Sequence, residues 1–208
     1  MKICKKLIAV SILLVAFFVT VTAEEADDKN AYLLSVISTP ENTLAFYKGY
    51  SKATEDTASF LRRQISLTND AMEKCLILFL LGVFRDDRSI STLIENFNVR
   101  NPMYDMPIDE IPFVREFPAE QALIRIGMPS LPAVTKLFLK SQEQAQRERC
   151  LSIIYFLYGR GVDNQKSLLF LTLTLEDEID ALEDKEHQAL LKSEIEAFIR
   201  QYNEGNLL

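Results

Sequence analysis

The stretch Ala122–Leu137, ALIRIGMPSLPAVTKL, constrains the fold more than any other part of the chain. It begins as an apolar helix, meets Gly127, passes through a turn that contains Pro129, and resumes as a second apolar helix near Leu131. Glycine suits the residue that follows a helix because it readily adopts a left-handed backbone, and proline suits the first turn of the next helix. The pattern predicts a helix hairpin, which is a structural unit and not a catalytic motif.

The same arrangement recurs around two more glycines. The residues five, four and one before Gly82, Gly127 and Gly159 are apolar or aromatic, a spacing that places them on one helix face. Each glycine is expected to end its helix as a C-cap, and Pro129 marks the turn that follows. The glycines are separated by 45 and then 32 residues, an interval typical of stacked helical repeats.

A second apolar helix is expected after each glycine, and other helix boundaries can also be read. Ser38–Glu41 predicts one helix start, and Thr68–Asp70 predicts another whose helix ends near Phe84. A last helix, from about Lys185 to Tyr202, has one apolar face and one charged face, as the end of a helical array requires. The predicted second helices of the three pairs are 90–97, 131–139 and 168–175. The last of these helices is expected to be buried, although the alternation in 169–175 leaves a strand as an alternative there.

Residues 118–137, PAEQALIRIGMPSLPAVTKL, resemble a HEAT-type repeat of the kind found in exported bacterial α-solenoids. Gln146–Leu151, QRERCL, resembles the basic start of the following repeat, and weaker similarity extends to 69–97 and 160–176. The resemblance implies an all-α fold, an armadillo-type superhelix or HEAT-like solenoid of stacked antiparallel helix pairs with a terminal capping helix. It also implies that Arg147 and Arg149 tie neighbouring helices together, in preference to recognising a ligand.

The N-terminus has the three-part layout of a secretory signal peptide. A cationic start, MKICKK, is followed by an apolar run over 7–21 and by the small residues of a cleavage site at Val21–Ala23. The apolar run is about 15 residues long, shorter than the roughly 17–25 that a membrane-spanning helix needs. We therefore expect residues 1–23 to be removed, 24–29 to be a polar leader, and 30–208 to form one helical domain. The expected location is the periplasm or the medium, with an uncleaved N-terminal anchor as the alternative.

The charge balance limits the choice of partners. The chain has a net charge of −7, and residues 1–23 contain three lysines and no acid, so cleavage after Ala23 would leave −10. Phosphate backbones and anionic lipid surfaces repel a chain this acidic. We therefore expect no nucleic-acid partner and no membrane insertion after cleavage.

Two cysteines follow the predicted signal peptide, Cys75 and Cys150. An exported chain with two cysteines invites a disulfide interpretation. Both, however, lie within apolar helical runs, and the hairpin around Gly127 would separate them in a stacked array. Two buried free thiols are the favoured prediction, and neither site has the polar surroundings of a catalytic thiol.

Motifs for catalysis, cofactors or metals are not found in the sequence. His187 is the single histidine, which disfavours His-based metal sites and catalytic triads, and its charged neighbours predict a solvated helix residue. Seven acids occur within 176–186, but no glycine lies there as a calcium-binding EF-hand loop would require. An acidic turn and helix start is the favoured interpretation. We expect no cofactor, no metal and no catalytic residue.

The insertion 98–117 is the best candidate for a functional segment. Prolines recur in it every five or six residues, so no helix can run through it, and many of its other residues are apolar. Two interpretations stay open: the loop covers its own repeats, or it presents side chains to a partner, since aromatic residues are common at interface hot spots. The predicted partner-binding residues are Met103, Tyr104, Ile108 and Phe113.

Helical arrays display long surfaces, so the predicted function is a non-catalytic scaffold that binds another protein in the cell envelope or periplasm of a bacterium. Self-association through apolar open ends is a further expectation. The main alternative is an enzyme, or an accessory subunit, that holds a small molecule in the groove, because a helical array does not exclude catalysis. That alternative predicts buried acids or tyrosines with shifted pKa values in a concave pocket.

Overall fold

The computed structural model describes four ranges of the chain, in which every regular element is a helix. The chain divides into two compact units, Met1–Tyr50 and Ser51–Leu208, and the predicted domain 30–208 extends across both. The predicted signal peptide, 1–23, lies outside the described residues, as does most of the predicted leader. The described ranges are 28–49, 55–104, 114–159 and 164–204.

The first unit contains a helix over 28–37 and the helix α2 (Pro40–Gly49). The Thr39 hydroxyl accepts a hydrogen bond of 3.2 Å from a backbone N–H in the first turn of α2, which is the cap that the sequence predicts. The buried Thr43 hydroxyl donates to the carbonyl of Val36 at 2.8 Å. This bond joins the two helices across the turn.

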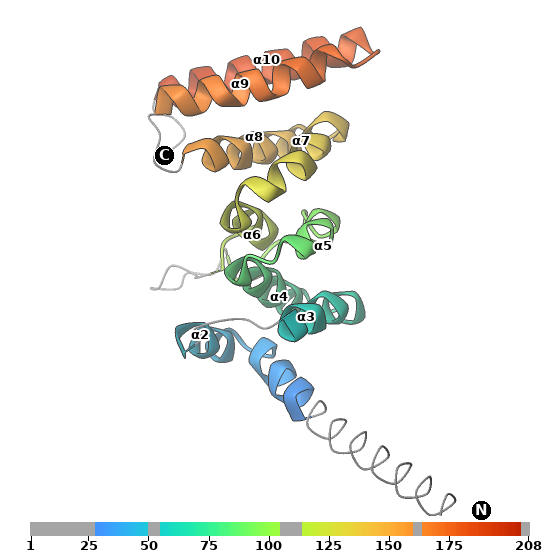
Figure 1. The fold of residues 1–208 in the computed structure, drawn as a ribbon, viewed down its shortest axis with the longest axis vertical. Helices are drawn as coiled ribbons and strands as arrows, with labels where there is room; N and C mark the ends of the chain where they lie inside the picture. The colour runs from blue at the N-terminus through green and yellow to red at the C-terminus, as the bar shows by residue number, and fades with distance from the viewer. Residues whose placement is uncertain (1–27, 50–54, 105–113, 160–163, 205–208) are drawn as a thin grey trace, which may run out of the picture. The chain divides into compact units, whose positions relative to one another are not determined.

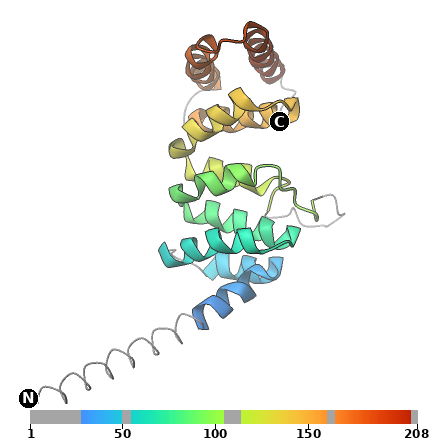
Figure 2. The same cartoon turned by 90° about the vertical axis from the view of Figure 1, so that its right-hand side faces the viewer.

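The helices of the second unit lie in successive layers in chain order, as the two views in Figures 1 and 2 agree. Neighbours along the chain pack together: α3 on α4, α7 on α8, α8 on α9, and α9 on α10. Contacts also join α4 to α6, α6 to α8, α8 to α10, and α5 to α7. The helices are α3 (Glu55–Leu67), α4 (Ala71–Phe84), α5 (Ile90–Glu95), α6 (Pro118–Ile126), α7 (Leu131–Lys140), α8 (Gln144–Gly159), α9 (Asn164–Asp180) and α10 (Lys185–Asn203).

Helix α4 lies at the centre of the core. It begins where predicted, with the Asp70 carboxylate accepting from the backbone N–H of Glu73 at 2.8 Å, and every residue from Cys75 to Gly82 is buried. An apolar helix buried on all sides is typical of a central position between neighbours. Cys75 and Cys150 are both buried and free, as predicted, and burial raises the pKa of each thiol to about 12. Both are therefore protonated, unreactive core side chains.

The predicted C-cap at Gly82 is wrong. Helix α4 continues through Gly82 to Phe84, and the residue with the left-handed backbone is Arg85, at φ 52°. Gly82 is needed for a different reason: a Cβ built there would lie 2.4 Å from Ala122 Cα on α6. The glycine allows two helix backbones to approach each other closely.

The other two glycines differ from each other. Gly127 ends α6 with φ 91°, and its N–H bonds the carbonyl of Leu123 at 3.1 Å. Pro129 lies in the short turn Met128–Ser130 that leads directly into α7. Gly159 is the last residue of α8 and has no positive φ, so the predicted left-handed cap is wrong there. A Cβ at Gly159 would lie 3.5 Å from Ser167 Oγ and 4.0 Å from Tyr155 Cε1, both ordinary contacts.

Residues 169–175 are helical, so the strand alternative is wrong. They form the middle of α9, where Leu168, Leu171 and Leu175 are buried. The expectation that this helix is buried holds for that face only, because Leu169 and Leu173 on the other face are more than half exposed. Helix α9 packs against α8 and α10 on one side and presents leucines to solvent on the other.

The acidic segment 176–186 spans two helices. Its first part is the C-terminal end of α9, whereas the prediction placed a turn there. Its second part does start a helix, because the Asp184 carboxylate accepts from the N–H groups of Glu186 and His187. In the four described ranges, no three His, Cys, Asp or Glu side chains are grouped to hold a metal ion. Among the described helices, none alone is long and apolar enough to cross a membrane; α6 and Met128–Lys140 meet the test only together, across a 117° bend.

Candidate functional site

Two adjoining hollows, of about 640 and 430 Å³, form a groove along the second unit. Phe117 and Ser152 line both, so we treat them as one and name it the α6–α8–α10 groove after the helices that form it. The larger hollow is lined by Asn98, Phe117, Glu143, Gln144, Ala145, Glu148, Arg149, Ser152, Glu194, Ala197, Phe198 and Gln201. The smaller is lined by Tyr104, Arg115, Glu116, Phe117, Glu120, Gln121, Ile124, Arg125, Ser152, Ile153 and Phe156.

The walls of the groove combine apolar and polar groups. Aromatic rings come from the insertion, from α8 and from α10, and two of them, Tyr104 and Phe156, are 44% and 48% exposed. Charged and amide side chains from α6, α8 and α10 surround them. An apolar surface with a polar rim is the usual composition of a protein-binding site, and the volume suits a peptide segment or a small molecule.

Arg149 holds the middle of the groove together. Its guanidinium carbon lies 4.7 Å from the ring centroid of Phe97 and 3.9 Å from that of Phe117. The same group donates to the backbone carbonyl of Phe97 at 3.4 Å and to the side-chain oxygen of Asn98. Arg149 therefore anchors the end of the α5 region and the start of α6 to α8, which is the structural role that the resemblance implies.

Glu120 is the carboxylate that faces Arg149. Its Oε1 lies 3.1 Å from Arg149 Nη1, and it lines the smaller hollow. Burial disfavours its charged form more than the guanidinium favours it, so the pKa of Glu120 is raised to about 7. Glu120 is thus a proton-binding group in the wall of the groove at neutral pH.

The raised pKa predicts a pH dependence of stability. The folded protein holds this proton up to about pH 7, whereas a glutamate in the unfolded chain loses it near 4.5, so the stabilising contribution is complete below about pH 4.5 and is lost as the pH rises through 7. The Glu120→Gln variant has no carboxyl to titrate at this position. We therefore expect its unfolding free energy to match that of the wild type at pH 5 and to exceed it by about 1–3 kcal/mol at pH 8, with a higher melting temperature there.

Thermal unfolding of both proteins from pH 4.5 to pH 8.5 measures this difference. The exposed groove residue Glu143 supplies the control, since Glu143→Gln removes one carboxyl of the same kind from the rim. Wild-type and Glu120→Gln curves that stay parallel over the whole range would contradict the prediction.

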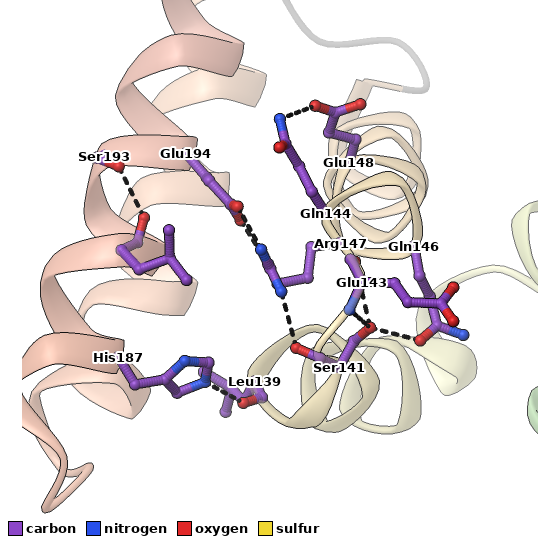
Figure 3. A network of polar contacts seen from close by, with 11 residues as sticks. Leu139, Ser141, Glu143, Gln144, Gln146, Arg147, Glu148, His187, Ser193 and Glu194 are labelled. Carbon is purple, nitrogen blue, oxygen red and sulfur yellow. Dashed lines mark hydrogen bonds and ion pairs between the residues drawn. The ribbon is translucent and has the colours of Figure 1, made fainter.

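Arg147 fixes α10 to α8 behind the groove (Figure 3). Its Nε and Nη2 donate to the two carboxylate oxygens of Glu194, at 2.7 and 2.6 Å, and its Nη1 donates to the carbonyl of Ser141 at 2.9 Å. The Arg147 and Glu194 side chains are only 5% and 11% exposed. The predicted tie between neighbouring helices is confirmed here, and it positions the helix that forms one wall of the groove.

His187 takes part in the same junction. Its Nε2 lies 2.8 Å from the carbonyl oxygen of Leu139, in the last turn of α7 (Figure 3). The last carbonyls of a helix have no partner within it, and the imidazole N–H supplies one. The side chain is half-buried, so the prediction of a solvated helix residue is right about the helix and only partly right about the solvent.

The two ends of the insertion are bound to each other. Asn101 is buried, and its side-chain amide donates to the carbonyl of Val114 at 2.9 Å. Its backbone N–H donates to the carbonyl of Glu116 at 2.7 Å, and the Arg100 guanidinium pairs with the Glu116 carboxylate at 2.8 Å. These bonds close the insertion at its base and hold Phe117 and Tyr104 beside α6.

The four predicted binding residues have different outcomes. Tyr104 lines the groove and is exposed, whereas Met103 is half-buried and lies outside the lining. Ile108 and Phe113 lie outside the described residues. Three residues that line the groove were not predicted from the sequence: Phe117, Phe156 and Glu120. Phe156 alone carried a usable signal, since it is an aromatic residue that falls outside the apolar stripe of its helix.

No protein-family model matches the chain, and comparisons with curated proteins and with solved structures find no similar protein. The resemblance to HEAT repeats therefore rests on the residues of this chain alone, and the function has to be argued from the groove.

Proposed function

We propose that this chain is an exported, non-catalytic scaffold that binds another protein in the periplasm or cell envelope, and that the partner contributes a segment to the α6–α8–α10 groove. The observation that carries the proposal is the groove itself: two connected hollows with exposed aromatic rings and a charged rim. Rings such as Tyr104 and Phe156 supply large contact areas at little cost in conformational entropy.

A HEAT-like α-solenoid is the architecture that we propose for the second unit. Two series of contacts between helices support it. Helices α4, α6, α8 and α10 contact one another in turn, and α5 contacts α7 beside them. Repeats in a solenoid contact only their neighbours, and the series α6, α8, α10 is the side that carries the groove.

The charges of the groove indicate which partner segment would fit. Glu143 and Glu148 are exposed on the rim of the larger hollow, and the whole chain carries a net charge of −7. A segment that combines apolar side chains with lysine or arginine would complement both the rings and the rim. The same charge disfavours nucleic acid as the partner.

Export is the part of the proposal that depends on the N-terminus. It rests on the cationic start, the short apolar run and the small residues at Val21–Ala23. Sequencing the N-terminus of the protein purified from cells tests it. A mature chain that starts at Glu24 supports export with cleavage, and an intact Met1 on membrane-bound protein favours the anchored alternative.

A charge introduced at Phe156 tests binding in the groove. We expect Phe156→Glu to weaken capture of the partner at least tenfold, because a carboxylate replaces an exposed ring in the apolar surface. A photo-reactive amino acid at Tyr104 should crosslink to the same partner in intact cells, and the yield should fall when Phe156→Glu is also present. Mass spectrometry of the crosslinked product identifies the partner.

Leu67→Glu is the matched control, since Leu67 is 74% exposed on α3 and lies outside the groove. It should leave both capture and crosslinking unchanged. Circular dichroism of all variants should show unchanged helix content. The groove would be ruled out as the binding surface if crosslinks persist in the Phe156→Glu variant. It would also be ruled out if Leu67→Glu lowers the crosslinking yield as much as Phe156→Glu does.

A small molecule in the groove is a second candidate function, favoured by one observation. Glu120 has a pKa raised to about 7 in a concave site, as the enzyme alternative predicts. A metabolite screen by thermal shift tests it, with Glu120→Gln as the variant that should lose the response. The scaffold remains the better-supported proposal because aromatic rings line both hollows, whereas Glu120 lines only the smaller one.

A further inference from the structure

Helix α9 carries an apolar face that no other described helix of the second unit covers. Leu169, Phe170 and Leu173 are 55%, 44% and 54% exposed, although Leu168 and Leu171 on the opposite face are buried. Phe170 is held in place by stacking on Tyr158 of α8, with ring centroids 5.5 Å apart. Adjacent exposed leucines on a well-formed helix indicate an interaction surface.

The spacing on this face is that of a helix–helix seam. Positions 166, 169, 173, 176 and 180 alternate between steps of three and four residues, and all five are exposed. This is the repeat with which two helices pack side by side. The buried leucines belong to a separate stripe, so the exposed seam is free to accept another helix without disturbing the packing on α8 and α10.

The charges at the two ends of the seam are opposite. Lys166 lies in the first turn of α9, where the helix dipole is also positive. Glu176, Asp177, Glu178 and Asp180 lie at the negative end. Lys192 on α10 pairs with Asp180 at 2.6 Å, and one lysine against four acids leaves that end negative. A second helix that runs parallel would meet like charges, whereas an antiparallel copy would meet opposite charges at both ends.

We propose that this face binds a second copy of the same chain, with the two α9 helices antiparallel about a two-fold axis. In this arrangement Leu169 of one copy lies opposite Leu173 of the other, and Lys166 lies opposite Glu176. A two-fold interface requires a surface that is complementary to itself, which this seam is in both shape and charge. The groove lies on other faces of the unit, so a dimer would present two grooves.

The association constant should be modest because each copy contributes one helix, less surface than a standard interface. Sedimentation velocity of the full protein should show a monomer–dimer equilibrium, with a dissociation constant on the order of 10 µM. Leu173→Glu should abolish the dimer at every concentration used and leave the melting temperature of the monomer unchanged. Leu190→Glu, at a residue 43% exposed on α10 and outside the seam, is the matched control and should still dimerise.

A charge swap tests the antiparallel register. Lys166→Glu should weaken the dimer about tenfold, since it places two acids opposite each other at both ends of the seam. Adding Glu176→Lys should restore most of the affinity, because each new glutamate then faces a new lysine.

A wild-type protein that stays monomeric at 200 µM would overturn the proposal, and so would a dimer that survives Leu173→Glu. If the variant with both Lys166→Glu and Glu176→Lys does not recover dimer affinity, the antiparallel register is wrong. Capture of the partner by the groove is measured with Phe156→Glu, a residue outside the seam, so either proposal can fail without the other.

Discussion

Gly82→Ala is expected to destabilise the protein by about 2 kcal/mol or more, although alanine is the better helix former. The added Cβ would lie 2.4 Å from Ala122 Cα and 2.6 Å from Ala122 Cβ. The first of these atoms belongs to the backbone of α6, so the clash can be relieved only by moving one helix away from the other. That movement would open the contact between α4 and α6 and loosen the α6 wall of the groove.

Thermal or urea unfolding measures this effect, with a fall in melting temperature of about 5 °C or more for a domain of this size. Gly159→Ala is the control, since its Cβ would come no closer than 3.5 Å to any neighbour and should be tolerated. Adding Ala122→Gly to Gly82→Ala removes the contact between Cβ atoms and leaves the one with Cα, so stability should recover in part. A Gly82→Ala protein as stable as Gly159→Ala would contradict the close approach of the helices.

Arg147→Met is expected to cost about 3–5 kcal/mol of unfolding free energy. Methionine keeps the apolar stem but leaves the nearly buried Glu194 carboxylate without its two charged donors, at 2.6 and 2.7 Å. The carbonyl of Ser141 loses its donor at the same time. Because these bonds join α8 to α10 and to the end of α7, we also expect faster hydrogen exchange throughout α10.

Adding Glu194→Met should return part of the lost stability, since an apolar pair is less costly in this position than a lone buried carboxylate. The exposed pair formed by Lys192 and Asp180 supplies the comparison: Lys192→Met should leave the melting temperature nearly unchanged, because solvent screens an exposed ion pair. Equal effects of Arg147→Met and Lys192→Met would show that the buried pair contributes little to holding α10.

The sequence predicted the helices well because their signals are local. The apolar periodicity, the Thr39 and Asp70 caps and the Gly127 turn depend on residues within a few positions of each other, and each is found where expected. The expected cap at Gly82 failed because a glycine also serves close packing, and that requirement comes from a helix distant in the sequence. Gly159 does end its helix, but without the left-handed backbone that was predicted.

The groove could be predicted only in part. Tyr104 was identified because an aromatic residue in a proline-rich insertion is conspicuous in any sequence. Glu120 was missed because its raised pKa comes from burial, which depends on how α6 packs. The exposed leucines of α9 were expected to be buried, since apolar residues alone do not reveal which of two helix faces the neighbours cover.

The sequence by itself determined that this chain is helical and where most of its helices begin and end. These properties follow from backbone geometry and from the chemistry of single side chains. Only the tertiary structure decided which surfaces form the groove, which carboxylate holds a proton at neutral pH, and which face of α9 meets solvent. Those properties arise where segments far apart in the chain pack together, and a local sequence pattern does not specify which distant segments pack against each other.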